Sequence, residues 1–435
     1  MLNRLRFYRV MVLAGCMSAN LVQPRGVFAQ QQDPAPPADA ATIKAVLERM
    51  KDLESQVTTL RARVQVLEKA EKAEKEAAAQ QPGQAPVADA TMPHEPAQEP
   101  SGPLMTHPGE GTTGPQLHLR GYGDIGWNTS DQKGATNSFA LGQFTLFINS
   151  NLSSNTRVLA ETVIEADAAT NLFDIEIERL EFLYTPNDRL TLAVGRYHTG
   201  MGYYNTAYHH SSLMQTTLGR PFLFDFEDKG GILPVHSVGV SATGTLSRAL
   251  GLNYVAEIGN GRDTRTDVSP VQNVTDNNDS KNFNLGLIER PGRWPGFQFG
   301  FSAFHDHVTP AGKANVGESI FVGHAVYQNS RFEFLNEAAV LHHSVDGADF
   351  SSNIPAFYSQ ISRRWGNYRP YLRYEYMNVP GSDPLFSGVG LRHGPKAGLR
   401  YDINEFAALK FEYGRLWQRN LRPVNTFGTQ LSFAF

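Results

Sequence analysis

The side chains best suited to act on a passing solute are acids in one long polar segment and bases in short alternating segments. Segment 197–234 carries Asp225, Glu227 and Asp228. Opposed acids and bases across a water-filled passage create a transverse field, which orients dipolar solutes and sorts ions. We therefore predict a pore constriction formed by these acids and by the basic residues Arg120, Arg157, Arg373 and Arg400.

The same residues allow a second interpretation. The acids could be solvated at a loop surface while the arginines pair with neighbours such as Glu161 and Glu375. The segment is also rich in rings, which could form a stacking track for sugars or aryl solutes or pack the segment against a wall. These side chains are Tyr203, Tyr204, Tyr208, His209, His210 and, beyond the segment, His236.

Metal binding and catalysis receive less support from the sequence. His305-Asp306-His307 and His342-His343 fall at the ends of apolar segments, where paired imidazoles could bind zinc or copper. Histidines at a wet loop edge are also ordinary polar surface, so we assign no metal ligands and no cofactor. The sequence contains no GxSxG, no HExxH and no phosphate-binding glycine loop, so we predict no catalytic residues and no enzyme activity.

The secondary structure that positions these side chains can be predicted from the pattern of apolar and polar residues in 117–435. Segments of about ten residues alternate apolar and polar side chains between turn residues, as in Phe144, Leu146 and Ile148 with Gln143 and Thr145. In other segments the polar set includes full charges, which the core of a soluble sandwich would not tolerate unpaired. We predict an all-β fold: a transmembrane antiparallel β-barrel of about sixteen strands, a size that leaves an aqueous channel.

The connections between these segments alternate in length. Short turns such as 186–188 and 366–367 separate longer polar loops, as expected for periplasmic turns and outer loops. Segment 197–234 is the longest and becomes the third outer loop. The alternation breaks phase between Glu178 and Arg179, which indicates a β-bulge or a strand portion that rises above the bilayer.

The chain begins with features of an export signal. Residues 1–29 combine a basic start, a short apolar stretch and a small-x-small site before Gln30, and residues 30–40 form a flexible leader. Leu13-Ala14-Gly15-Cys16 resembles a lipoprotein box and offers lipidation of Cys16 as the alternative.

A heptad pattern follows and predicts an α-helical coiled coil over residues 41–76. Two R-h-x-x-h-E matches favour three strands, whereas valine at a with leucine at d favours two. A linker rich in proline and glycine covers residues 77–116. The predicted seam consists of Ile43, Val46, Met50, Leu53, Val57, Leu60, Val64 and Leu67.

The bulk composition excludes two other classes of protein. The 435 residues carry a formal net charge of −4, so no nucleic-acid partner is predicted. No run of about 18 apolar residues occurs, which excludes a helical membrane protein.

The chain ends in alternating apolar residues that finish at Phe435, which resembles the sorting signal read by the β-barrel assembly machinery. The whole plan resembles the trimeric porin superfamily, and stretch 194–202 is most similar to the phosphate-selective porin O/P type. The resemblance implies a homotrimer in the outer membrane of a Gram-negative-type cell, with a periplasmic N-terminal region and a third outer loop that folds inward. Those porins line the pore with basic residues, whereas this lumen mixes signs, so phosphate selectivity does not carry over.

The leading functional hypothesis is passive diffusion of small hydrophilic solutes or ions through the barrel. A rival hypothesis is a structural protein that tethers the envelope layers, with the coiled coil contacting peptidoglycan and the barrel anchored in outer-membrane lipid. A rim metal-binding protein or a rim enzyme is a third hypothesis.

Overall fold

The computed structural model describes residues 115–435, apart from 168–171, 210, 263–273, 277 and 311. The predicted signal peptide with Cys16, the leader and the coiled coil with its seam from Ile43 to Leu67 lie outside the described residues, as does all but the end of the linker. His210 also lies outside them.

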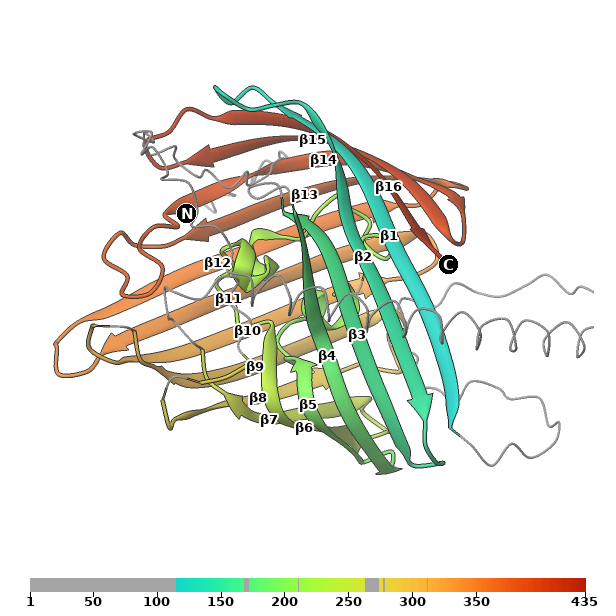
Figure 1. The fold of residues 1–435 in the computed structure, drawn as a ribbon, viewed down its shortest axis with the longest axis vertical. Coiled ribbons are helices and arrows are strands. Elements are labelled where there is room, and N and C mark those ends of the chain that lie inside the picture. The colour runs from blue at the N-terminus through green and yellow to red at the C-terminus, as the bar shows by residue number, and fades with distance from the viewer. Residues whose placement is uncertain (1–114, 168–171, 210, 263–273, 277, 311) are drawn as a thin grey trace, which may run out of the picture. The chain divides into compact units, whose positions relative to one another are not determined.

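Sixteen strands in this part of the chain form a closed antiparallel barrel (Figure 1), which confirms the predicted fold and strand number. Each strand pairs with its neighbours in the chain, and β16 closes the barrel on β1. No helix in the described residues is long and apolar enough to cross a membrane. The strands are β1 (Gln116–Ser130), β2 (Ser138–Asn151), β3 (Thr156–Asp167), β4 (Leu172–Asn187), β5 (Leu190–His198), β6 (His236–Ser247), β7 (Leu252–Asn260), β8 (Lys281–Glu289), β9 (Phe297–Val308), β10 (Val316–Gln328), β11 (Phe332–Val345), β12 (Ser351–Arg363), β13 (Tyr368–Asn378), β14 (Leu391–Asn404), β15 (Ala407–Gln418) and β16 (Val424–Ala434).

The outer surface of the barrel is apolar because successive side chains of a strand point to opposite faces. On β8, Phe283, Leu285 and Leu287 are exposed on the outside, while Asn282 and Asn284 are buried on the inside. Exposed aromatic side chains gather beside the short turns at one end of the barrel. They include Trp294, Phe297, Phe332, Trp365, Tyr368 and Phe406.

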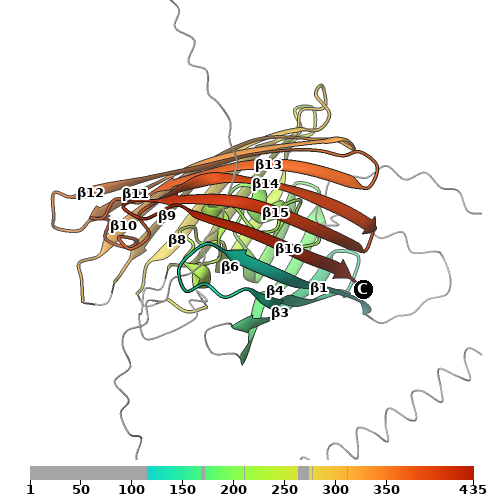
Figure 2. The ribbon, with the colours of Figure 1, turned by 90° about the horizontal axis from the view of Figure 1, so that it is seen from above.

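The connections confirm the predicted asymmetry between the two ends. Turns such as 188–189 and 405–406 join strands at one end, and longer connections, including 199–235 and 379–390, join them at the other. Connection 199–235, which we call L3, contains α2 (Tyr203–Ala207), η1 (Phe222–Phe224) and η2 (Glu227–Lys229). Its path runs inside the ring of strands, as the two views of the green segment show (Figures 1 and 2).

L3 packs against the inner face of β9–β13 and β15 and forms an apolar core there. Tyr204, Phe224 and Leu233 of L3 are almost completely buried, together with wall residues such as Ile320 and Leu335. The inner face of this wall therefore differs from the polar lumen expected from the sequence, because L3 covers it and excludes water. The remaining inner face mixes charged side chains with a smaller apolar cluster of Leu159, Leu183 and Ala193.

The predicted bulge in β4 is confirmed. The pairing of β3 with β4 shifts between Glu161 and Thr162, so that Glu178 is an extra residue in β4. Glu178 and Arg179, although adjacent, are both buried inside the barrel. The backbone carbonyl of Glu178 accepts a hydrogen bond from Arg196 Nε at 3.1 Å. A bulge is what allows two neighbouring charged side chains to share one face of a strand.

Gly195 lies on β5 beside this bulge, and only glycine fits its conformation. Its φ is +136°, and a Cβ there would lie 1.9 Å from the carbonyl oxygen of Leu180. A Cβ at Gly286 of β8 would meet its nearest atoms at 3.6 Å, which is ordinary contact.

We expect Gly195→Ala to destabilise the barrel by about 2–5 kcal/mol through backbone strain and overpacking. Gly286→Ala serves as the matched control and should refold like the unmodified chain. Urea unfolding in detergent, followed by the electrophoretic shift between the folded and the heated barrel, measures both variants. Equal stability of the two variants would contradict the strain described for Gly195.

Candidate functional site

Buried carboxylates of the wall hold the backbone of L3 through its N–H groups. Glu337 on β11 accepts from the N–H groups of Tyr203 and Tyr204, the latter at 2.8 Å. Glu375 on β13 accepts from the N–H of Phe222 at 2.7 Å, and Glu412 on β15 accepts from the N–H of Leu218 at 3.2 Å. Charge-assisted bonds of this kind are stronger than neutral ones, so these acids fix the course of L3.

Arg373 donates to the same segment from β13. Its Nη2 lies 2.9 Å from the carbonyl oxygen of Gly219 and 3.0 Å from that of Arg220, and its Nη1 lies 2.8 Å from Thr217 Oγ1. Its Nε donates to Glu375 at 2.6 Å. This predicted constriction residue is thus fully buried, and it donates to L3, to one carboxylate and to Gln360 on β12.

Arg400 and Lys410 act in the same way from β14 and β15. Arg400 Nη1 donates to the carbonyl oxygen of Gln215 at 2.9 Å, and its Nε donates to Asp402 at 2.6 Å. Lys410 Nζ donates to the carbonyl oxygen of Thr217 at 3.0 Å. Wall acids and wall bases together bind L3 along one half of the barrel.

The other half of the barrel contains an open cavity with both charged and apolar side chains in its lining. A cavity of about 960 Å³ extends from the short-turn end up to α2, along β3 to β8 and the short-turn ends of β9 and β10. Both signs of charge line it, and its charged side chains are Arg157, Arg179, Glu181, Glu257 and Arg290.

The predicted constriction residues do not lie together in the structure. Arg157 lines the cavity, whereas Arg120 is exposed on β1 opposite Phe147 near the short-turn end. Glu227 accepts hydrogen bonds from the backbone N–H and Nδ1 of His236, at 3.1 and 3.2 Å. The side chain of Asp228 lies outside the described part of the chain.

Asp225 lies in L3 among charges that the sequence prediction did not include. It is half-buried, and burial raises the pKa of its carboxyl to about 7, with nearby Glu375 adding to the rise. Lys396, Arg392 and Arg220 lower the pKa in turn. At neutral pH this carboxyl therefore sits near the midpoint of its titration.

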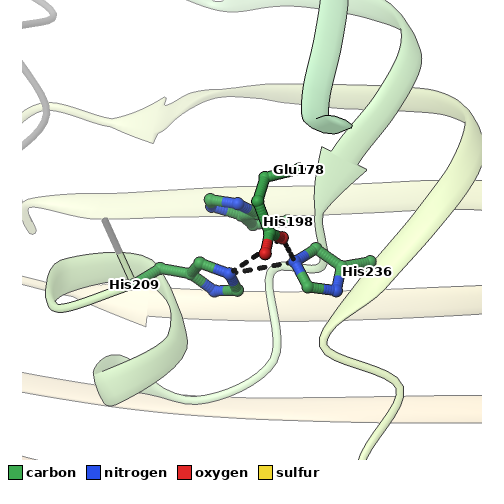
Figure 3. Close-up of side chains that lie close together, drawn as sticks. All are labelled: Glu178, His198, His209 and His236. Carbon is green, nitrogen blue, oxygen red and sulfur yellow. Dashed lines mark hydrogen bonds and ion pairs between the residues drawn. The ribbon is translucent and has the colours of Figure 1, made fainter. Parts of the chain in front are cut away.

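Four side chains from four neighbouring segments converge where L3 meets β4, β5 and β6 (Figure 3). Glu178 comes from the bulge of β4, His198 from the end of β5, His209 from the turn after α2, and His236 from the start of β6. One ligand atom of each residue lies within 4.8 Å of the others. The Nε2 atoms of His209 and His236 are 2.9 Å apart, and Glu178 Oε2 contacts both imidazoles.

The surroundings of this cluster orient its rings. His209 Nδ1 lies 2.8 Å from Asn205 Oδ1, and the ring of His198 stacks on that of His209 with centroids 3.4 Å apart. Burial, followed by the charge of Arg220, holds the pKa of His209 well below its usual range. His209 is therefore a neutral imidazole with one nitrogen lone pair available.

The histidine groups that the sequence suggested for metal binding do not converge. His342 is partly exposed and bonds Asn353, whereas its neighbour His343 is buried between Glu318 and Asp383, at 3.1 and 2.8 Å. His305 bonds Ser319 on the exposed side, and Asp306 is buried and accepts from the N–H of Arg262. Adjacent strand residues face opposite sides of the barrel wall, so such pairs cannot chelate one ion.

Comparison with known proteins places the fold. No protein-family profile matches the chain, and no curated protein sequence matches it. Among solved structures, the anion-selective porin from Comamonas acidovorans matches 74% of this chain and 100% of its own, with 11% identity and a TM-score of 0.54. The trimer form of OmpT, an outer membrane protein of Vibrio cholerae, matches 74% of this chain and 100% of its own, with 11% identity and a TM-score of 0.52.

The outer membrane channel DcaP of Acinetobacter baumannii matches 75% of this chain and 99% of its own, with 9% identity and a TM-score of 0.51. At these identities the likeness concerns the fold. Residues 115–435 thus share the barrel fold of outer-membrane porins.

Proposed function

We propose that the protein is an outer-membrane porin through which small hydrophilic solutes or ions diffuse passively. One observation carries the proposal: a closed barrel with an apolar outer face contains a cavity of about 960 Å³, lined by charges of both signs, beside an inward-folded loop. Lipid requires the apolar outer face, and a barrel of this size leaves room for water inside.

The proposed partners follow from the same features. The exposed aromatic side chains beside the short turns suit a membrane interface, where rings with polar edges are favoured. A homotrimer agrees with the trimer form of the Vibrio protein. Phe435 stays the proposed signal for the β-barrel assembly machinery, and its N–H and carbonyl groups pair with Gly121 at 2.9 and 2.8 Å.

The preferred solute class is neutral or zwitterionic in this proposal. The cavity wall combines Arg157, Arg179 and Arg290 with Glu181 and Glu257, so neither sign of ion has a clear advantage. Charges of both signs orient a dipolar solute instead. Phosphate selectivity, which the family resemblance suggested, gains no support from this lining.

Reconstitution of the full chain in planar bilayers and in liposomes tests the proposal. We expect stepwise currents, in groups of three for a homotrimer, and liposome swelling with small sugars and amino acids. A silent bilayer, obtained with protein whose electrophoretic shift on heating shows a folded barrel, would contradict the porin. It would favour the tethering role, with its proposed contact of the coiled coil to peptidoglycan.

A further inference from the structure

We propose that Glu178, His198, His209 and His236 form a binding site for one divalent transition-metal ion, with zinc as the best match. The site lies where L3 meets the wall at β4, β5 and β6 (Figure 3), so the bound ion would tie L3 to this side of the barrel. The inference goes beyond solute diffusion and does not depend on it.

The geometry of the four side chains suits a tetrahedral ion. Zinc–nitrogen and zinc–oxygen bonds of about 2.0–2.2 Å place neighbouring ligand atoms about 3.3 Å apart. The Nε2 atoms of His209 and His236 are 2.9 Å apart, and His209 Nε2 is 3.8 Å from Glu178 Oε2. These two distances bracket the required value, and the ligand atoms of all four residues lie within 4.8 Å of one another, so binding requires side-chain rotations that draw them together.

Two of the rings are held so that their Nε2 atoms face each other. Asn205 donates through Nδ2 to the carbonyl oxygens of Thr199 and Val235, at 2.9 and 3.2 Å, which leaves its Oδ1 to accept from His209 Nδ1 at 2.8 Å. Glu227 accepts from His236 Nδ1 at 3.2 Å. Oxygen acceptors on the far nitrogen are the usual support of a metal-bound histidine.

With both imidazoles neutral, three electron-pair donors therefore meet at one buried point: the two Nε2 atoms and the carboxylate of Glu178. The four side chains have exposed fractions of only 2–6%. Without a cation between them, these groups would repel each other and lose their hydration. Either a metal ion or an extra proton on an imidazole can fill this role, and the experiment below separates the two.

Zinc fits the ligand types better than the other common ions. Three imidazoles and one carboxylate form a nitrogen-rich set, which suits zinc, whereas calcium and magnesium prefer oxygen ligands. The bulge at Glu178 supplies the carboxylate. His198 is the last residue of β5 and His236 is the first residue of β6, so they flank L3, and His209 lies within L3.

The test uses the full chain, purified in detergent and stripped with a chelator. Titration with Co²⁺, which reports tetrahedral coordination by its visible d–d absorption, is followed by competition with Zn²⁺. We expect one Co²⁺ per chain, displaced by Zn²⁺, and binding at least about 100-fold weaker in His209→Ala and His236→Ala. His305→Ala and His342→Ala remove an exposed and a partly exposed histidine on other strands and should bind like the unmodified chain.

Folding is checked for every variant by the electrophoretic shift on heating, so a loss of binding is not confused with a loss of the barrel. If the folded unmodified chain fails to bind Co²⁺ or Zn²⁺ in a one-to-one ratio, the proposal is overturned and the cluster is held by a proton. Binding that is equal in His209→Ala and in the controls overturns it as well. Neither result affects the channel experiment.

Discussion

Arg373→Ala is expected to raise the single-channel conductance, by about twofold, because it releases L3 from the wall of the pore. The guanidinium donates to Thr217 and to the backbone carbonyls of Gly219 and Arg220 while pairing with Glu375. Removing one partner of a buried ion pair costs about 3–5 kcal/mol. Here Lys396, at 3.2 Å from Glu375, retains part of the pairing, so we expect L3 to detach without unfolding of the barrel.

Arg157→Ala is the matched control for this experiment. It also removes one positive charge from the interior, but Arg157 lines the open cavity on the opposite side from the attachment of L3. This control should shift ion preference with little change in conductance. If both variants raise the conductance equally, charge and not the release of L3 is responsible, and the role described for Arg373 is wrong.

Lowering the pH from about 8 to about 6 is expected to lower the cation-to-anion permeability ratio, by about twofold, through protonation of Asp225. The pKa of this carboxyl is raised to about 7 by burial and by Glu375 on β13, against Lys396 and Arg392 on β14 and Arg220 in L3. Below this pKa the carboxyl is neutral, and the interior loses a negative charge that attracts cations. Reversal potentials in a salt gradient measure the change.

Asp225→Asn isolates this contribution, since other groups also titrate in the same range of pH. The variant should show, at both pH values, the lower cation preference of the unmodified chain at acid pH. The difference between the two proteins is the quantity to compare. A pH dependence that is identical in both would exclude Asp225 as its source.

The sequence predicted the barrel well because alternation is a local signal. Neighbouring residues such as Phe283 and Asn284 predict the outer and inner faces of their strand without information from any other strand. The break in alternation at Glu178 likewise predicted the bulge. The inner apolar wall was not predictable in this way. Ile320 and Leu335 are buried because L3 crosses the barrel to reach them, and no local pattern encodes that contact.

The candidate sites show the same limit. Arg373 and Arg400 alternate with apolar residues as lumen side chains do, but only the folded loop shows that carbonyl oxygens of L3 accept their donors. The cluster around Glu178 was also missed, since its members are spread over 59 positions in the sequence, from 178 to 236. The one sequence feature that could have indicated the cluster is that His198 and His236 lie at the two ends of the predicted long loop.

The hydrogen bonds that hold L3 connect residues very far apart in the chain. Tyr203 and Glu337 are separated by 134 positions, and Leu218 and Glu412 by 194. Since such distant contacts form only after the intervening chain is in place, L3 acquires its final partners after β11 to β15 have been added. A chain that lost β14 to β16 would therefore keep the anchor of Tyr203 on β11 but lack the anchor of Leu218 on β15, so one end of L3 would be fixed before the other.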